Sequence, residues 1–238
     1  MFVRLAGCPL RCRYCDTRYA FYSGHRMSLA KILTTVCSYQ RSSCDKSPPA
    51  KEKVALCNGA AAHSVFRAHS PFVTVTGGEP LAQSFCRELL GCLCDAGYQV
   101  SLETCGALDV AGVDERVSIV MDIKTPGSGE VQRNRYGNLA ALSAKDQVKF
   151  VICDRQDYEW ARARLDEWDI GSRCEVLFLP VQVRECTTQS VVDGAPGGKP
   201  MIETLLPGTL ADWILADRLP VRMQIQLHKY LWGDVAGR

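Results

Sequence analysis

Net charge, long hydrophobic runs and internal repeats are all scarce in this chain of 238 residues. Its formal charge of +2 gives no broad cationic field, so we do not expect it to bind nucleic acid directly. No apolar run approaches the ~18 residues of a membrane span, and the first residues, with Arg4 among them, lack the hydrophobic region of a signal peptide. We therefore expect a cytoplasmic protein with no membrane partner.

Cysteine, by contrast, is abundant, with 13 residues. This odd number would be hazardous in an oxidising compartment, whereas in a reducing cytosol thiols stay free or bind metal. Cys44, Cys57 and Cys186 lie in polar loops and leave a second metal site open. Most of the others lie in or beside apolar runs and are predicted to be buried small hydrophobic residues: Cys37, Cys86, Cys92, Cys94, Cys105, Cys153 and Cys174.

The three remaining cysteines, Cys8, Cys12 and Cys15, form a C-x3-C-x2-C segment near the N-terminus. This spacing matches no common zinc or disulfide pattern, and it suits an iron–sulfur cluster. A [4Fe-4S] cubane has four irons and normally takes four thiolates, so three thiolates leave one iron open to a small molecule. A structural zinc site with His25 as its fourth ligand is the alternative.

Strand-like and helix-like segments alternate along the chain, which is typical of a parallel sheet with crossover helices. An irregular insertion is expected at 41–70, so we predict a single α/β domain over 1–238 that forms a partial, open (β/α) barrel rather than a closed one. The helix that follows Pro80 should place Phe85, Leu89 and Leu93 on one buried face. The expected strands are 2–6, 72–76, 99–103, 117–123, 147–152, 175–180 and 221–227, and further helices are expected at 29–40, 158–165 and 209–216.

Polar motifs follow the ends of several predicted strands, where ligands bind in folds of this class. The motifs are Cys8, Gly77-Gly78-Glu79, Glu103-Thr104 and Asp122-Ile123-Lys124, so we expect them to share one site. Two successive glycines allow a ligand to approach the backbone closely. Plainer interpretations are a simple turn for the glycines and turn capping or ion pairing for the carboxylates.

Lys149 falls within an apolar strand, where an ammonium group needs a partner or a polar cavity. We therefore expect its side chain to face the interior of the barrel.

These motifs resemble the radical S-adenosylmethionine superfamily, through the three cysteines with Tyr14 and through Thr76-Gly77-Gly78-Glu79-Pro80. The resemblance extends to the 7-carboxy-7-deazaguanine synthase family. It implies the conversion of 6-carboxy-5,6,7,8-tetrahydropterin to 7-carboxy-7-deazaguanine with loss of ammonia, a lyase step toward queuosine. The segments that carry it are 2–8, 15–17, 74–83, 103–106, 122–126, 146–151 and 224–229.

The same resemblance implies a [4Fe-4S] cluster on Cys8, Cys12 and Cys15, S-adenosylmethionine on the open iron, and Mg²⁺ on Thr17. It implies no catalytic residue beyond the cluster and cofactor, an electron donor such as flavodoxin or ferredoxin, and a homodimer. The implied substrate contacts are Arg4, Thr76 and His228. The implied S-adenosylmethionine contacts are Tyr14, Cys15, Asp16, Gly77, Gly78, Glu79, Glu103, Asp122, Lys124 and Thr125.

The chain departs from the family pattern in two places. The family's Gln-Gly-Glu-like substrate-binding segment has no counterpart before Met1-Phe2-Val3, so part of the substrate pocket is expected to be missing and substrate binding to be weakened. The insertion at 41–70 is the second departure.

Two other functions stay open. A radical activase uses the same cysteine spacing to generate a glycyl radical in a partner protein, but Asp16-Thr17 and His228-Lys229 argue against it. A noncatalytic iron–sulfur or metal-binding module would need only the cysteines, and would leave the glycine motif and the strand-end carboxylates without a role.

Overall fold

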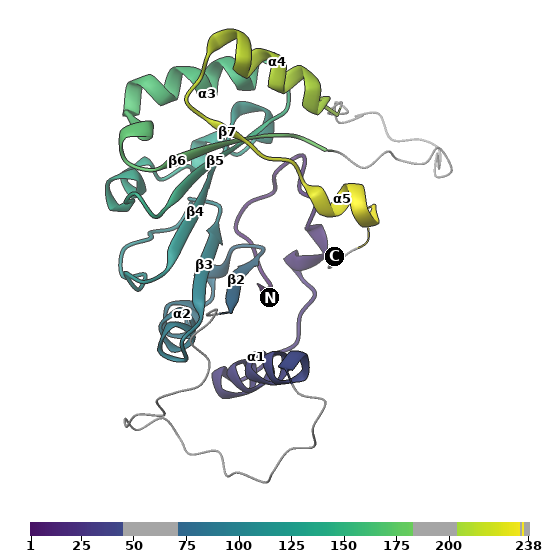
Figure 1. Ribbon diagram of the computed structural model, residues 1–238, viewed down its shortest axis with the longest axis vertical. Helices are drawn as coiled ribbons and strands as arrows, with labels where there is room; N and C mark the ends of the chain where they lie inside the picture. Colours follow the sequence, from purple (N-terminus) through teal and green to yellow (C-terminus); the bar gives the residue numbers. More distant parts are fainter. Residues whose placement is uncertain (45–70, 183–203, 234, 236–238) are drawn as a thin grey trace.

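A computed structural model describes residues 1–44, 71–182, 204–233 and 235 of the chain. Its centre is a curved parallel sheet whose strands pair in the order of the sequence, from β1 at one edge to β7 at the other (Figure 1). Because the two edge strands are not paired with each other in this order, the partial, open barrel is confirmed. The strands are β1 (Phe2–Leu5), β2 (Phe72–Gly77), β3 (Gln99–Thr104), β4 (Ser118–Ile123), β5 (Gln147–Ile152), β6 (Glu175–Pro180) and β7 (Arg222–Met223).

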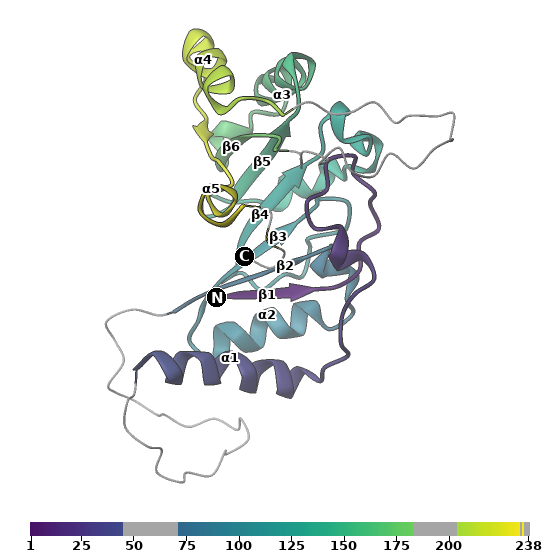
Figure 2. The ribbon, with the colours of Figure 1, turned by 90° about the vertical axis from the view of Figure 1, so that its right-hand side faces the viewer.

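Five α-helices accompany the described strands: α1 (Leu29–Cys44), α2 (Cys86–Asp95), α3 (Arg155–Trp168), α4 (Pro207–Asp217) and α5 (Leu227–Trp232). Helices α1 and α2 lie outside the first strands and α3 and α4 outside the last ones, whereas α5 stands apart from both pairs (Figure 2). None of the helices in the described ranges is long and apolar enough to cross a membrane. Short 3-10 turns lie at Arg18–Phe21, Pro80–Ala82, Pro126–Ser128, Val131–Arg133, Tyr136–Ala141 and Ile170–Ser172.

Alternation along the strands separates an apolar outer face from a polar inner face. In β4 and β5 every second residue is buried, as expected for side chains that point to opposite faces of a sheet. Met121 and Phe150 are buried in the core that the helices cover. Asp122 and Lys149 take the intervening positions and line a cavity on the inner face. Buried parallel strands are usually apolar on both faces, so the polar inner face indicates a binding site.

The predicted final strand is wrong beyond its first residues. Pairing with β6 ends at Met223, and Leu227 already begins α5, so His228 lies in a helix and not at a strand end. The helix predicted from Pro80 is also divided: a 3-10 turn at Pro80–Ala82 precedes α2, which starts at Cys86. Phe85 precedes α2 and is 67% exposed, so it does not join Leu89 in the core as predicted.

Helix α1 continues through Cys44, so residues 41–44 are helical and not part of an irregular insertion as predicted, and Cys44 does not lie in a loop. Residues 45–70, with Cys57, lie outside the described residues, as does Cys186. The predicted burial of the other cysteines holds in part: Cys37, Cys92 and Cys94 are half-buried. Those that are fully buried are Cys86, Cys105, Cys153 and Cys174.

Candidate active site

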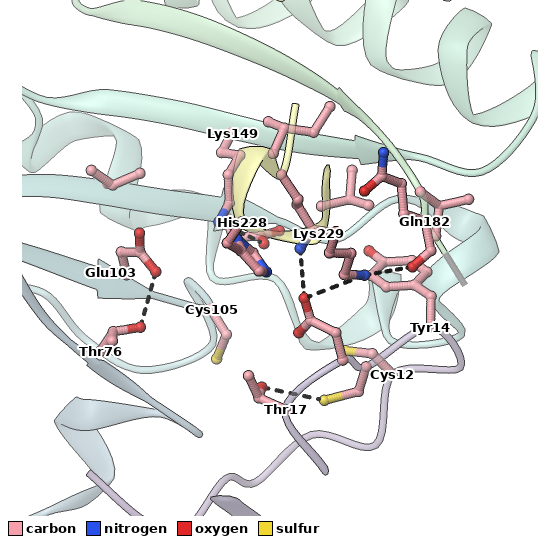
Figure 3. Close-up of a pocket in the computed structure, with 18 of the residues that line it drawn as sticks. Cys12, Tyr14, Thr17, Thr76, Glu103, Cys105, Lys149, Gln182, His228 and Lys229 are labelled. Carbon is pink, nitrogen blue, oxygen red and sulfur yellow. Dashed lines mark hydrogen bonds and ion pairs between the residues drawn. The ribbon is translucent and has the colours of Figure 1, made fainter. Parts of the chain in front are cut away.

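A cavity of about 810 Å³ opens on the inner side of the sheet, between the cysteine segment, the carboxyl ends of the strands and α5 (Figure 3). Glu79 and Thr125 are not among the residues that line it. All the other predicted site residues do line it: Arg4, Cys8, Cys12, Tyr14, Cys15, Asp16, Thr17, Thr76, Gly77, Gly78, Glu103, Asp122, Lys124 and His228.

Hydrogen bonds that do not involve the cysteine side chains hold the cysteine segment, both within the segment and from a neighbouring loop. The Arg11 guanidinium donates to the backbone carbonyl of Cys8 at 2.7 Å, within the segment. The Arg11 amide donates to Glu130 Oε1 at 2.7 Å, and the Arg13 amide donates to the Ser128 carbonyl at 3.0 Å. Glu130 and Ser128 belong to the loop after β4, so this loop forms the outer support of the cysteine segment.

The three cysteines are free, half-buried thiols. Burial raises the pKa of Cys8, and it raises the pKa of Cys12 to about 11 although the nearby Lys124 ammonium lowers it. The Cys8 and Cys12 thiols are therefore protonated at neutral pH, and a metal that binds them must displace their protons. Three cysteine thiols of this kind are suitable ligands for an iron–sulfur cluster.

A single metal ion suits the three cysteines less well than a cluster does. No three His, Cys, Asp or Glu side chains in the described part of the chain converge on one point. A cubane does not need such convergence, because each of its irons takes one thiolate. His25, the expected fourth ligand of a zinc site, is exposed and does not line the cavity. The zinc alternative thus lacks its fourth ligand among the described residues.

The double glycine at the end of β2 packs against the chain itself. A Cβ on Gly77 would lie 1.9 Å from the Leu5 carbonyl oxygen, and one on Gly78 would lie 2.2 Å from the Gly7 carbonyl oxygen. The Gly78 amide donates a hydrogen bond to the Leu5 carbonyl oxygen at 2.9 Å. This close approach joins the end of β2 to the chain just before the cysteine segment. Both glycines also line the cavity, where a ligand can reach their backbone.

Glu79 and Thr125 lie behind the cavity wall. The Glu79 carboxylate is fully buried and accepts hydrogen bonds from the amides of Leu81 at 3.0 Å and Cys105 at 2.6 Å and from the Thr104 hydroxyl at 2.9 Å. It therefore ties the end of β2 to the end of β3.

The Thr125 hydroxyl donates to Asp157 on α3 at 2.9 Å, and Asp157 also accepts from the Gly127 amide at 2.8 Å. Asp157 was not among the predicted site residues, and its only local signal is its place in the first turn of a helix.

Charged and polar side chains on the inner face are paired across neighbouring strands. Thr76 donates to Glu103 Oε2 at 2.9 Å. Asp122 lies between two ammonium groups, with Lys124 Nζ at 3.1 Å and Lys149 Nζ at 3.5 Å. Burial lowers the pKa of Lys124, but the Asp122 carboxylate together with Tyr14, Cys12 and Cys105 outweighs this effect and raises the pKa well above its ordinary value. Lys149 thus faces the interior and has a partner, as predicted.

The Tyr14 hydroxyl is a hydrogen-bond donor on the cavity wall without a partner among the described residues. It is buried, and burial raises its pKa well above the ordinary value. An unpaired buried donor on a cavity wall suits a polar ligand.

No protein-family model matches the chain. A relative from Chlorobaculum tepidum, named 7-carboxy-7-deazaguanine synthase, is 38% identical over 238 residues, which cover 99% of this chain and 86% of the relative. This chain belongs to the 7-carboxy-7-deazaguanine synthase family. A second relative of the same name, from Koribacter versatilis, is 35% identical and covers 98% of this chain and 88% of its own length. The family resemblance carried by the cysteine segment and the double glycine is confirmed.

Solved structures share the fold of this family member. Escherichia coli QueE has a TM-score of 0.55 at 15% identity, with 94% of this chain and 84% of that chain covered. Streptococcus suis SuiB bound to S-adenosylmethionine has a TM-score of 0.53 at 12% identity, with 94% of this chain and 49% of that chain covered. At these identities the two structures support the fold alone.

Proposed function

We propose that this chain is a radical S-adenosylmethionine enzyme that converts 6-carboxy-5,6,7,8-tetrahydropterin, here called the carboxypterin, to 7-carboxy-7-deazaguanine. One observation carries the proposal: the free thiols of Cys8, Cys12 and Cys15 line the same cavity as the substrate-side residues Arg4 and His228. The names of the curated relatives support the same reaction.

Cofactor binding falls to the cysteine side of the cavity. Cys8, Cys12 and Cys15 would hold the [4Fe-4S] cluster, which with S-adenosylmethionine supplies reductive cleavage of the sulfonium and a carbon-centred radical. The unpaired Tyr14 hydroxyl and the Lys124 ammonium offer hydrogen-bond donors to the cofactor. The other proposed contacts are the backbone of Gly77 and Gly78 and the side chains of Glu103 and Asp122. Asp16, which the resemblance also implies as a contact, lines the cavity beside them.

Glu79 and Thr125, which do not line the cavity, would act through the loops that they hold. Their contribution to cofactor binding is therefore proposed to be indirect.

The side of the cavity opposite the cysteines is proposed to bind the substrate. The Arg4 guanidinium forms the planar donor set that suits a carboxylate or the edge of a pterin ring. Thr76 and Glu103 are hydrogen-bonded to each other, and His228 lies across the cavity on α5. Thr17 offers a hydroxyl oxygen 3.7 Å from Cys15 Sγ, a hard ligand suited to a Mg²⁺ ion that also binds the substrate carboxylate.

We extend the proposal to a single domain over 1–238, a cytoplasmic homodimer, and flavodoxin or ferredoxin as the electron donor. These attributes accompany the resemblance to the family.

Anaerobic reconstitution with iron and sulfide tests the proposal. The reconstituted protein, given reductant, S-adenosylmethionine, Mg²⁺ and the carboxypterin, should form 7-carboxy-7-deazaguanine. Cleavage of S-adenosylmethionine without this product would favour a radical activase, and no cleavage at all would favour a noncatalytic module. A Cys12→Ala variant should be inactive, whereas Cys94→Ala, on the outer helix α2, should keep its activity.

A further inference from the structure

Asp16, which follows the third cysteine of the segment, contacts the C-terminal part of the chain. Its Oδ2 atom accepts a hydrogen bond from Gln226 Nε2 at 2.5 Å, across 210 positions of sequence. The Lys229 ammonium lies 3.9 Å from the same oxygen. All three residues line the cavity, and Figure 3 shows Lys229 there beside His228. Asp16 therefore joins the cofactor side of the site to the element that carries His228.

Helix α5 depends on such polar contacts because little apolar packing holds it. It has six residues, and none of them is buried against the described part of the chain. Leu227, Tyr230 and Leu231 are each more than half exposed, at 58%, 57% and 59%. A helix this short is unstable without tertiary contacts.

Gln182, which follows β6, also contacts α5. Its carbonyl accepts a hydrogen bond from Lys229 Nζ at 2.7 Å, and its Nε2 donates to the Tyr230 hydroxyl at 3.1 Å. Lys229 thus reaches both Gln182 and Asp16, and it is only 13% exposed. The Asp16 side chain is 35% exposed, so water partly screens this pair, and we expect the shorter hydrogen bond from Gln226 to contribute most of the contact.

We propose that Asp16 is a positioning residue that holds α5, and His228 with it, over the cavity. The role differs from a direct contact with S-adenosylmethionine, because the Asp16 carboxylate is engaged by Gln226 and Lys229. The consequence for catalysis rests on the proposed function: Asp16 should affect use of the carboxypterin more than binding of the cofactor.

Hydrogen exchange of the full chain without ligands tests the contact independently of any activity. In Asp16→Ala, the amides of 227–233 should exchange about tenfold faster than in the wild type, as expected when a charge-assisted hydrogen bond is lost. Gln226→Ala should give the same change without altering the cysteine segment. Asp212→Asn, an exposed carboxylate on α4, is the matched control and should change nothing. Unchanged exchange in both Asp16→Ala and Gln226→Ala would overturn the proposal.

Steady-state kinetics test the consequence. In Gln226→Ala and Asp16→Ala the KM for the carboxypterin should rise about tenfold, while the Kd for S-adenosylmethionine and the iron content stay within about twofold. Asp16→Glu, which keeps the charge, should recover part of the loss.

Weaker cofactor binding in Asp16→Ala alone, with normal exchange, would instead make Asp16 a direct cofactor ligand. If the wild type formed no product, the proposed function would fail, and the exchange experiment would still decide the positioning role.

Discussion

The Glu79 carboxylate accepts a hydrogen bond of 2.6 Å from the backbone amide of Cys105, and this contact ties the end of β2 to the end of β3. Since the double glycine directly precedes Glu79, the position of the glycines in the cavity depends on a side chain that lies behind it.

We predict that Glu79→Ala destabilises the fold strongly, because it leaves the buried Leu81 and Cys105 amides and the Thr104 hydroxyl without their acceptor. The free energy of unfolding in urea should fall by about 3 kcal/mol or more, and by about 1–2 kcal/mol in Glu79→Gln, which keeps one acceptor oxygen. Glu88→Ala, an exposed carboxylate on α2, should stay within about 0.5 kcal/mol of the wild type. A loss below about 1 kcal/mol in Glu79→Ala would contradict this role.

Removing one thiolate should abolish the cluster without unfolding the chain. Cys12 is half-buried and outside the hydrophobic core, so Cys12→Ala should keep the circular dichroism and melting temperature of the wild type. After anaerobic reconstitution it should hold little iron and show no turnover, because the metal bond is lost while the core is unchanged. Cys94→Ala serves as the control. Full iron content and activity in Cys12→Ala would refute the assignment of the cluster ligands.

Thr17→Ala should separate the response to Mg²⁺ from cleavage of the cofactor. If its hydroxyl binds the ion, stimulation of product formation by Mg²⁺ should fall about tenfold, while cleavage of S-adenosylmethionine changes little. Thr34→Ala, whose hydroxyl bonds within α1, should respond as the wild type does. Equal losses in both measurements would argue against Thr17 as the ligand.

Asp146 should make the fold sensitive to acid. Burial alone would raise its pKa, but hydrogen bonds from the Ile119 and Ser143 amides, both at 2.8 Å, and from Lys145 lower it below the ordinary value of 3.8. As the pH falls below 3.8, the unfolded chain binds a proton before the folded chain does, so the stabilisation decreases and is lost below the folded pKa.

Asp146→Asn should therefore be less stable than the wild type by about 1–3 kcal/mol at pH 7. This difference should shrink as the pH falls below 3.8, which urea unfolding at several pH values would measure. A difference that stayed constant down to the acid transition would contradict the assignment.

The sequence predicted the sheet well because its strands are short, β-branched and apolar, and are separated by clear turn and helix signals. It also predicted most of the cavity lining, because residues such as Thr76, Asp122 and Lys124 lie at the carboxyl ends of parallel strands, and those ends meet at one edge. The site therefore followed from local pattern and one topological rule.

The parts that were missed depend on contacts between distant segments. Val221, Met223, Ile225 and Leu227 alternate as in a strand, but pairing stops at Met223 although β6 continues to Pro180. A short alternating run does not show where its pairing with a neighbouring strand stops. The same holds for Asp16, whose contact with α5 spans most of the chain and leaves no local signal.

The unpaired edges of the barrel have a consequence for the ligands that this framework can accept. Since β1 and β7 are not joined by a ladder of hydrogen bonds in the described sheet, pairing between these two strands does not fix the width of the opening. Substitutions at this opening can change the size of the ligand that fits without changing the fold.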